Sequence, residues 1–231
     1  MPGNNRFLTA EWKNLLMLNY AVDPSLVEPF VPAGTELDTF GGNTYVSLVG
    51  FEFNRTRVLG FTVPFHQNFE EVNLRFYVRR GSKRGVVFIR ELVPRYAVAM
   101  IARFAFNENY SCVPMSHRVE AGKVEYSWKL GSGRCVMTIE TDGERFLPLE
   151  GSLSQFITEH YWGYTPQKGG TLEYEVQHPP WPVWNAKQAS FSGNAAGLYG
   201  VEIEQILKRE PDSAFLAQGS PVTVFKSTRI S

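Results

Sequence analysis

Cysteine and long apolar runs are both scarce in this chain of 231 residues. Its two cysteines, Cys112 and Cys135, lack the C-x-x-C spacing, so the sequence predicts neither a disulfide framework nor a zinc site built on thiolates. The first residues show no basic segment followed by an apolar one, and the apolar run at 15–18 is far too short to span a bilayer. We therefore expect a cytosolic protein with reduced thiols and no membrane partner.

Charge of one sign is not in excess. Lysine and arginine number 23, and aspartate and glutamate also number 23. A net charge of zero argues against a protein that binds nucleic acid through its bulk field. The basic residues that gather at 79–84 are typical of a solvated hairpin end. We expect no nucleic-acid partner.

The common motifs of metal, nucleotide and nucleophile chemistry are also missing. Four histidines lie on separate predicted elements without the H-E-x-x-H spacing, which predicts no metal site. Because there is no G-x-G-x-x-G and no P-loop, no nucleotide site is encoded and no cofactor is expected. The G-S-L-S-Q segment at Gly151 is not a G-x-S-x-G elbow, and a helix cap explains it better.

Short strand-like segments separated by turns make up most of the chain. We treat residues 1–231 as a single domain, because 43% hydrophobic residues can bury one large core and no linker or repeat divides the sequence. Strands in hairpin order predict an antiparallel, mainly β (α+β) fold, closed into a barrel or folded into two layers, rather than a Rossmann sheet or TIM barrel. The predicted strands are 12–21, 35–40, 44–53, 71–80, 86–89, 115–120, 124–130, 134–141, 171–178, 188–192 and 220–226, and the predicted helices are a short one from Pro24, 94–107, 153–161 and 201–208.

Two of these predictions rest on strong local signals. Gly41-Gly42-Asn43 lies between two strand-like segments and predicts that 35–40 and 44–53 form a hairpin. Pro94 is followed by apolar residues at three- and four-residue spacing, which predicts the helix over 94–107.

The stretch 64–80 carries the candidate site. From Glu71 onward apolar and polar residues alternate strictly, so a strand's period of two separates them onto opposite faces. A polar row of this kind most often faces water, and the alternative is that it faces a functional interior. The apolar face holds Val72, Leu74, Phe76 and Val78, and the polar face holds Glu71, Asn73, Arg75, Tyr77 and Arg79.

Several segments between residues 7 and 183 resemble one protein family. They are F-L-T-A-E-W-K-N-L-L-M-L-N-Y, V-P-A-G-T-E-L-D, N-F-E-E-V-N-L-R-F-Y-V, F-I-T-E-H-Y-W-G-Y-T and H-P-P-W-P-V. Together they resemble the uncharacterised YqjF-like family of bacterial proteins, which is similar in turn to the acetoacetate decarboxylase superfamily. The resemblance implies a cone-shaped antiparallel β-barrel flanked by β-sheet and a few short helices, with a pocket inside the cone. By analogy with the superfamily's assemblies, it also implies a homo-oligomer.

The acetoacetate decarboxylase motif can be laid on this chain residue by residue. In that enzyme a strand with an acidic residue precedes a segment of the type Arg-Glu, a few residues, Pro, Lys, Lys. The acidic position falls on Glu71 or its neighbour Glu70, and the Arg-Glu pair falls on Arg90 and Glu91. The proline falls on Pro94.

The two lysine positions hold Arg95 and Tyr96, and there the match ends. Decarboxylation through a Schiff base needs an amine of lowered pKa. Arginine stays protonated and is a poor nucleophile, and tyrosine forms no imine. This departure predicts that the protein does not decarboxylate β-keto acids through an imine.

The altered motif suggests acid–base chemistry instead. Arg95 at the first turn of a helix could hold a carboxylate or phosphate. Glu71 could act as a general base, with Tyr96 as acid or oxyanion donor. We therefore take Glu71, Arg95 and Tyr96 as candidate catalytic residues. The candidate ligand-binding residues are His66, Glu70, Asn73, Arg75, Arg90 and Glu91.

Three functions remain open at this point. The first is an enzyme, of lyase or hydratase type, that acts on a small carboxylated or carbonyl compound without a Schiff-base lysine. The second is a non-catalytic protein that binds a small anionic or carbonyl ligand, with Glu71 and Arg95 forming only a structural ion pair. The third is a structural oligomerisation module.

Overall fold

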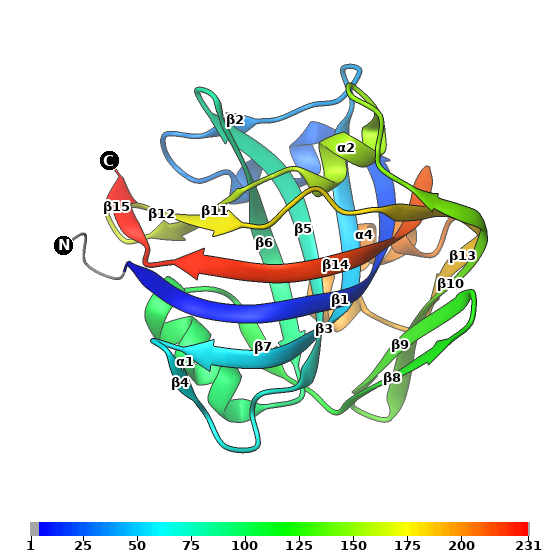
Figure 1. Ribbon diagram of the computed structural model, residues 1–231. Helices are drawn as coiled ribbons and strands as arrows, with labels where there is room; N and C mark the ends of the chain where they lie inside the picture. The colour runs from blue at the N-terminus through cyan, green and yellow to red at the C-terminus, as the bar shows by residue number, and fades with distance from the viewer. Residues whose placement is uncertain (1–4, 231) are drawn as a thin grey trace.

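A closed ring of strands forms the centre of the molecule. The computed structural model describes residues 5–230, except for the side chains of residues 102–105. Around the ring the strands follow the order β12-β11-β6-β5-β3-β1-β14, and β12 pairs with β14 to close it (Figure 1). The ring strands are β1 (Arg6–Val22), β3 (Thr44–Val58), β5 (Phe69–Arg80), β6 (Lys83–Val93), β11 (Trp162–Gln167), β12 (Gly170–Gln177) and β14 (Ser213–Phe225).

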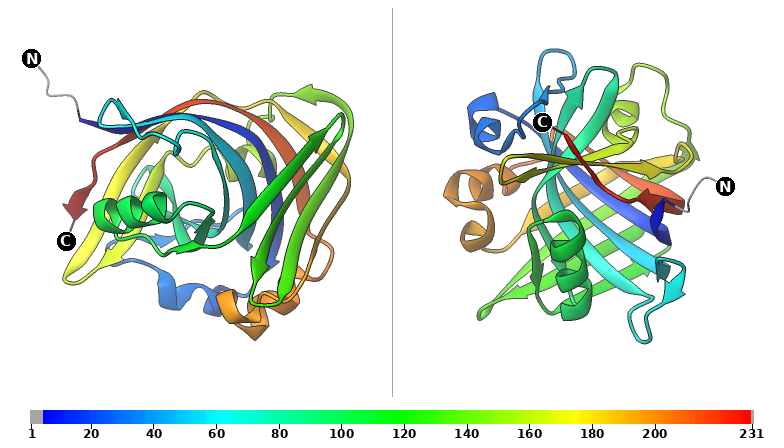
Figure 2. Two further views of the ribbon diagram at one scale, coloured as in Figure 1. Left: turned by 90° about the horizontal axis from the view of Figure 1, so that it is seen from below. Right: turned by 90° about the vertical axis from the view of Figure 1, so that its left-hand side faces the viewer.

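A second group of strands extends the sheet beyond β14. These strands lie beside the ring in the order β13, β10, β9, β8 (Figure 2, left). They are β13 (Val183–Ser192), β10 (Gly133–Phe146), β9 (Lys123–Leu130) and β8 (Met115–Glu120). Four short strands pair with the ends of ring strands: β2 (Glu36–Leu37) with β5, β4 (Phe61–Thr62) with β3, β7 (Tyr110–Cys112) with β6 and β15 (Thr228–Ile230) with β12. The predicted mainly β fold, a barrel with flanking sheet, is confirmed.

The helices are short and lie between strands. Within the described residues, none of them is long and apolar enough to cross a membrane. α1 lies at the open end of the ring in the view from below (Figure 2, left). The helices are α1 (Tyr96–Phe106), α2 (Leu153–Thr158), α3 (Ala196–Tyr199) and α4 (Val201–Leu207), with 3-10 turns η1 (Pro24–Leu26) and η2 (Glu28–Phe30).

The wall of the ring is buried on both faces. Val72, Leu74 and Phe76 of β5 pack in an apolar cluster that also contains Trp128 of β9. The alternate residues of β5 point into the ring, where Tyr77 belongs to a second apolar cluster. The period-two prediction for this strand is thus confirmed, whereas the interpretation of its polar row as a water-facing surface is wrong for Glu71, Asn73 and Tyr77, which are all buried.

One predicted hairpin does not form. β2 pairs with β5 instead of β3, and the Gly41-Gly42-Asn43 turn closes only an isolated bridge between Phe40 and Asn43. The reason is tertiary: Asp38, which follows β2, is buried and accepts hydrogen bonds from Arg84 at 2.7 Å and His160 at 3.0 Å. These contacts hold the segment against β5 and β6. The sequence also gave no sign of β11, the strand that completes the ring.

Within the ring, β11 and β6 meet at a short parallel seam of two residue pairs: Trp162 with Gly85 and Gly163 with Val86. Two glycines permit this close approach. A Cβ on Gly163 would overlap the ring of Tyr174, and a Cβ on Gly85 would lie 2.6 Å from Tyr164 Cε2. Both tyrosines are buried and cannot move into solvent. Close packing at the seam therefore requires glycine at both positions.

Gly163→Ala is expected to lower the free energy of unfolding by about 1–3 kcal/mol, because the added methyl group overpacks the Tyr174 ring. Urea denaturation measures the change. Gly197→Ala in α3 is the matched control, since a Cβ there meets open space and should alter stability by less than about 1 kcal/mol. Equal effects of the two substitutions would contradict the overpacking argument.

Candidate functional site

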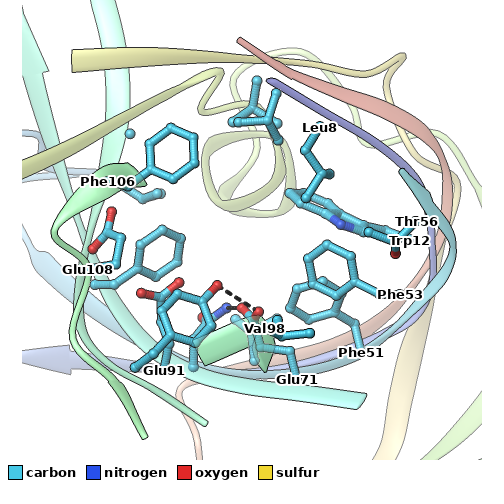
Figure 3. A pocket seen from close by; sticks show the side chains of 18 of the residues that line it. Leu8, Trp12, Phe51, Phe53, Thr56, Glu71, Glu91, Val98, Phe106 and Glu108 are labelled. Carbon is cyan, nitrogen blue, oxygen red and sulfur yellow. Dashed lines mark hydrogen bonds between the residues drawn. The ribbon is translucent and has the colours of Figure 1, made fainter. Parts of the chain in front are cut away.

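A pocket lies inside the ring, and its acidic residues follow one another along one part of the wall. In Figure 3 this acidic wall runs from Glu108 on the left through Glu91 to Glu71 at the bottom, and Phe51, Phe53 and Trp12 line the right side. Phe51 is the cross-strand neighbour of Glu71. The cavity has a volume of about 140 Å³. An engineered cavity of about 150 Å³ takes up benzene, so the pocket suits a small molecule.

Glu71 is held in place by two hydrogen bonds. It is 2% exposed, and its carboxyl accepts from Asn73 Nδ2 at 3.0 Å and from the Tyr110 hydroxyl at 2.9 Å (dashed in Figure 3). Burial raises the pKa of Glu71 to about 7, although both hydrogen bonds and the charge of Arg75 act in the opposite direction. A carboxyl with such a pKa exchanges protons readily at neutral pH.

Glu108 is the acidic residue that the sequence did not reveal. It lies between α1 and β7 and is 5% exposed. Its Oε1 accepts from Thr165 Oγ1 at 2.6 Å and from the Tyr174 hydroxyl at 2.9 Å. Burial raises the pKa of Glu108 to about 7, and the charge of Glu71 adds to the shift. No motif or periodicity marks this loop residue, so its position could not be found without the fold.

Glu91 completes the acidic wall. It lies on β6 opposite Asn73, and it is 2% exposed. Its Oε2 is buried without a hydrogen-bond partner among the described residues. Burial raises the pKa of Glu91 well above its ordinary 4.5, and the charges of Glu108 and Glu71 raise it further. Burial and the neighbouring carboxyls therefore favour the protonated form of Glu91, although a hydrogen bond with Tyr110 acts in the opposite direction on its pKa.

The acidic wall has no direct counter-ion among the described side chains. The ion pairs among the described side chains do not include Glu71, Glu91 or Glu108. Neighbouring carboxyls in an apolar site cannot all ionise together, so the cluster shares protons at neutral pH. No lysine lines the pocket among the residues that the structure describes. Nor do any three of the described His, Cys, Asp and Glu residues form a group that could hold a metal ion.

Two predicted catalytic residues lie elsewhere. Arg95 is exposed, Tyr96 is 68% exposed, and neither lines the pocket. The expected Glu71–Arg95 pair is not formed. The reason is the orientation of α1: Ala97, Val98 and Ile101 face the pocket, so Tyr96 is left on the outer side of the helix.

The predicted ligand-binding residues divide between the two faces of the wall. Glu70 lies outside and contacts His117 Nδ1 at 2.7 Å, and Arg90 lies outside and donates to Ser111 Oγ at 3.2 Å. The alternation that turns Glu71 and Glu91 inward turns these sequence neighbours outward. The predicted residues that line the pocket are His66, Glu71, Asn73, Arg75 and Glu91.

Comparison with solved structures identifies the class of fold. The structure is similar to acetoacetate decarboxylase from Legionella pneumophila subsp. pneumophila str. Philadelphia 1, with a TM-score of 0.74 and 14% identity over 100% of this chain and 92% of that one. It is also similar to the enduracididine biosynthesis enzyme MppR complexed with pyruvate, with a TM-score of 0.71 and 12% identity over 97% and 90% of the two chains. At these identities the likeness shows the acetoacetate decarboxylase-like fold alone.

Sequence comparison then gives the family. Residues 9–221 match the model of DUF2071, an uncharacterized conserved protein, and the chain belongs to that family. It is 24% identical to the uncharacterized protein YqjF of Bacillus subtilis (strain 168) over 209 residues, which cover 89% of this chain and 86% of YqjF. The resemblance found in the sequence motifs is confirmed.

Glu108→Gln should weaken the pH dependence of stability. The folded protein holds the Glu108 proton up to pH about 7, whereas the unfolded chain releases it near 4.5. The folded state then binds more protons in this window, so the contribution of Glu108 to the free energy of unfolding falls as pH rises, by at most about 1.4 kcal/mol per pH unit. Gln keeps the Oε1 acceptor and cannot ionise.

Urea denaturation from pH 5 to pH 8 measures the difference. Wild type should lose stability relative to Glu108→Gln as pH rises through this range. Glu144→Gln, a change to an exposed carboxyl on β10, is the control. A constant difference between wild type and Glu108→Gln would show that the Glu108 carboxyl is ionised throughout.

Proposed function

We propose that this protein is an enzyme that moves a proton on a small carbonyl compound, with Glu71 as the general base and Glu91 as the hydrogen-bond donor to the carbonyl oxygen. The observation that supports this most is the pairing of two buried carboxyls of different character in one apolar pocket. Glu71 has a pKa of about 7 and is fixed by two donors, whereas the pKa of Glu91 is raised by burial and by two neighbouring carboxyls, and its Oε2 has no hydrogen-bond partner among the described residues. Two carboxyl groups whose environments shift their pKa values differently can divide the roles of base and acid between them.

The proposed reaction begins with proton abstraction. The ionised Glu71 carboxyl takes a proton from the carbon next to the carbonyl group, and the electron pair of that C–H bond moves toward the carbonyl oxygen to form an enolate. The Glu91 O–H donates a hydrogen bond to the oxygen as negative charge develops there. Return of the proton from Glu71 to a carbon atom completes an exchange or isomerisation without any other reactant.

The surrounding side chains support both groups. Asn73 and Tyr110 each donate to one oxygen of Glu71 and so fix the plane of its carboxyl. The aromatic side chains of the pocket offer an apolar surface to the body of the substrate. Exclusion of water from such a site strengthens the hydrogen bond that Glu91 donates.

A non-catalytic ligand-binding protein is the second candidate. The predominance of apolar side chains in the pocket, including Trp12, Phe51 and Phe53, favours it, because such a lining binds small apolar molecules without any chemistry. The two candidates differ in what Glu71 does. In an enzyme its loss abolishes turnover, and in a binding protein it only changes affinity.

Proton exchange tests the catalytic proposal. Wild-type protein in D₂O at neutral pH should exchange the α-protons of at least one ketone in a series such as acetone, cyclohexanone and phenylacetone, as followed by NMR. Glu71→Gln should lower the rate by about 100-fold or more, because general-base catalysis contributes about 10²–10⁴-fold. Arg95→Gln should leave it unchanged, since Arg95 lies outside the pocket. Ketone binding without exchange would favour the binding protein.

Borohydride reduction in the presence of acetoacetate should leave no covalent adduct, because no lysine lines the pocket among the described residues. The mass of the intact protein measures this. An acetoacetate-dependent mass increase on a single lysine would refute the proposal that the chemistry proceeds without an imine.

A further inference from the structure

Arg75 is the only lysine or arginine among the described residues that line the pocket. It lies on β5, on the same face of the strand as Glu71 and Asn73. Its guanidinium is partly buried, and this sets it apart from Arg79 two residues further on, which is exposed and paired with Glu36 at 3.0 Å. The pocket therefore has a cationic group as well as an acidic wall.

The guanidinium lacks an anionic partner among the described residues. Its Nη2 donates to the backbone oxygen of Ile157 at 3.2 Å, and its Nε is buried without a hydrogen bond. Glu71 feels the charge of Arg75 but forms no ion pair with it. A guanidinium shielded from water is costly unless an anion neutralises it.

The two histidines of the pocket that are buried nearest this end of it do not compete for the same anion. His160 and His178 also line the pocket, and burial lowers the pKa of each to about 4, with the charge of Arg75 contributing. Both rings are therefore neutral at pH 7. An anion that enters this end of the pocket meets one cation, and that cation is a planar fork suited to a carboxylate.

The head group of Arg75 has contacts on both sides of its own position along the strand. In the register of the sheet Arg75 pairs with Ser47, whereas Met17 lies level with Val49 and Asn73. Yet Arg75 Nη2 lies 4.0 Å from Met17 Sδ. The guanidinium carbon also lies 5.7 Å from the centre of the Tyr77 ring, which is two residues further along the strand on the side away from Glu71, so the head group stays near the level of its own Cα.

We infer that Arg75 binds the carboxylate of the ligand, and that the ligand is a small oxo acid whose carbonyl group lies several bonds away, beside Glu71 and Glu91. The carbonyl end of this inference rests on the proposed function, whereas the carboxylate end rests on Arg75 alone. Four residues of strand place the Cα atoms of Glu71 and Arg75 roughly 13 Å apart, and hydrogen bonds of about 3 Å at the carboxylate and at the carbonyl group leave about 7 Å for the ligand between them. A γ- or δ-oxo acid spans such a gap, and a β-keto acid is too short.

Matched neutral and anionic ligands test the inference by calorimetric or NMR titration. Wild type should bind 5-oxohexanoate at least about tenfold more tightly than 5-oxohexanamide, because only the acid can pair with the guanidinium. It should also bind 5-oxohexanoate more tightly than acetoacetate. Arg75→Gln should abolish the preference for the acid over the amide, and Arg79→Gln, on the same face of the same strand, should retain it.

The outcomes separate this inference from the proposed function. Glu71→Gln should keep the preference for the acid, even where proton exchange is lost. A preference for the acid without any proton exchange would support Arg75 as the carboxylate site while removing the enzyme. Equal binding of acid and amide by wild type, or no binding of the acid at millimolar concentration, would overturn the inference, and this comparison does not require any variant to fold.

Discussion

The cost of placing ionisable groups in an apolar interior governs this structure. Three carboxyl groups and one guanidinium share a pocket that is otherwise lined mainly by apolar side chains. The carboxyls lower the cost by keeping protons and by accepting hydrogen bonds from Asn73, Tyr110, Thr165 and Tyr174. The guanidinium cannot give up its proton. The pocket is thus chemically asymmetric, with groups at one end that adjust their charge and a group at the other that cannot.

The pocket also differs from what the acetoacetate decarboxylase motif predicts, because it lacks the two amines of that motif. The motif positions that hold lysines in acetoacetate decarboxylase fall on Arg95 and Tyr96, which lie outside the pocket. Nothing replaces those amines among the described side chains of the interior. The shared architecture thus contains a pocket without a lysine among its described lining residues, which is consistent with the principle that one fold carries sites of different chemistry.

Much of the fold was accessible from the sequence, because it is written in local periodicity. The alternation along β5 correctly placed Glu71, Asn73 and Arg75 on one face, since a strand's period of two is fixed by its backbone. The sequence could not predict which distant parts of the chain each side chain faces. Nothing local states that the polar face of β5 meets an enclosed cavity, or that a loop residue such as Glu108 arrives opposite it. The misplacement of Arg95 has the same origin, because helix orientation is decided by packing.

The seam between β6 and β11 joins the stability of the ring to the chemistry of its interior. Thr165 of β11 and Tyr174 of β12 both hold Glu108, and Tyr174 also fills the space that Gly163 leaves beside it. The seam is two residue pairs long, and so is the pairing of β12 with β14 on the other side of the β11–β12 hairpin. Few backbone hydrogen bonds therefore hold this hairpin in the ring, at the place where Glu108 is anchored. Both donors to Glu108 therefore belong to the hairpin that the shortest strand pairings hold in the ring, so a local opening of this hairpin would remove both hydrogen bonds from Glu108 at once.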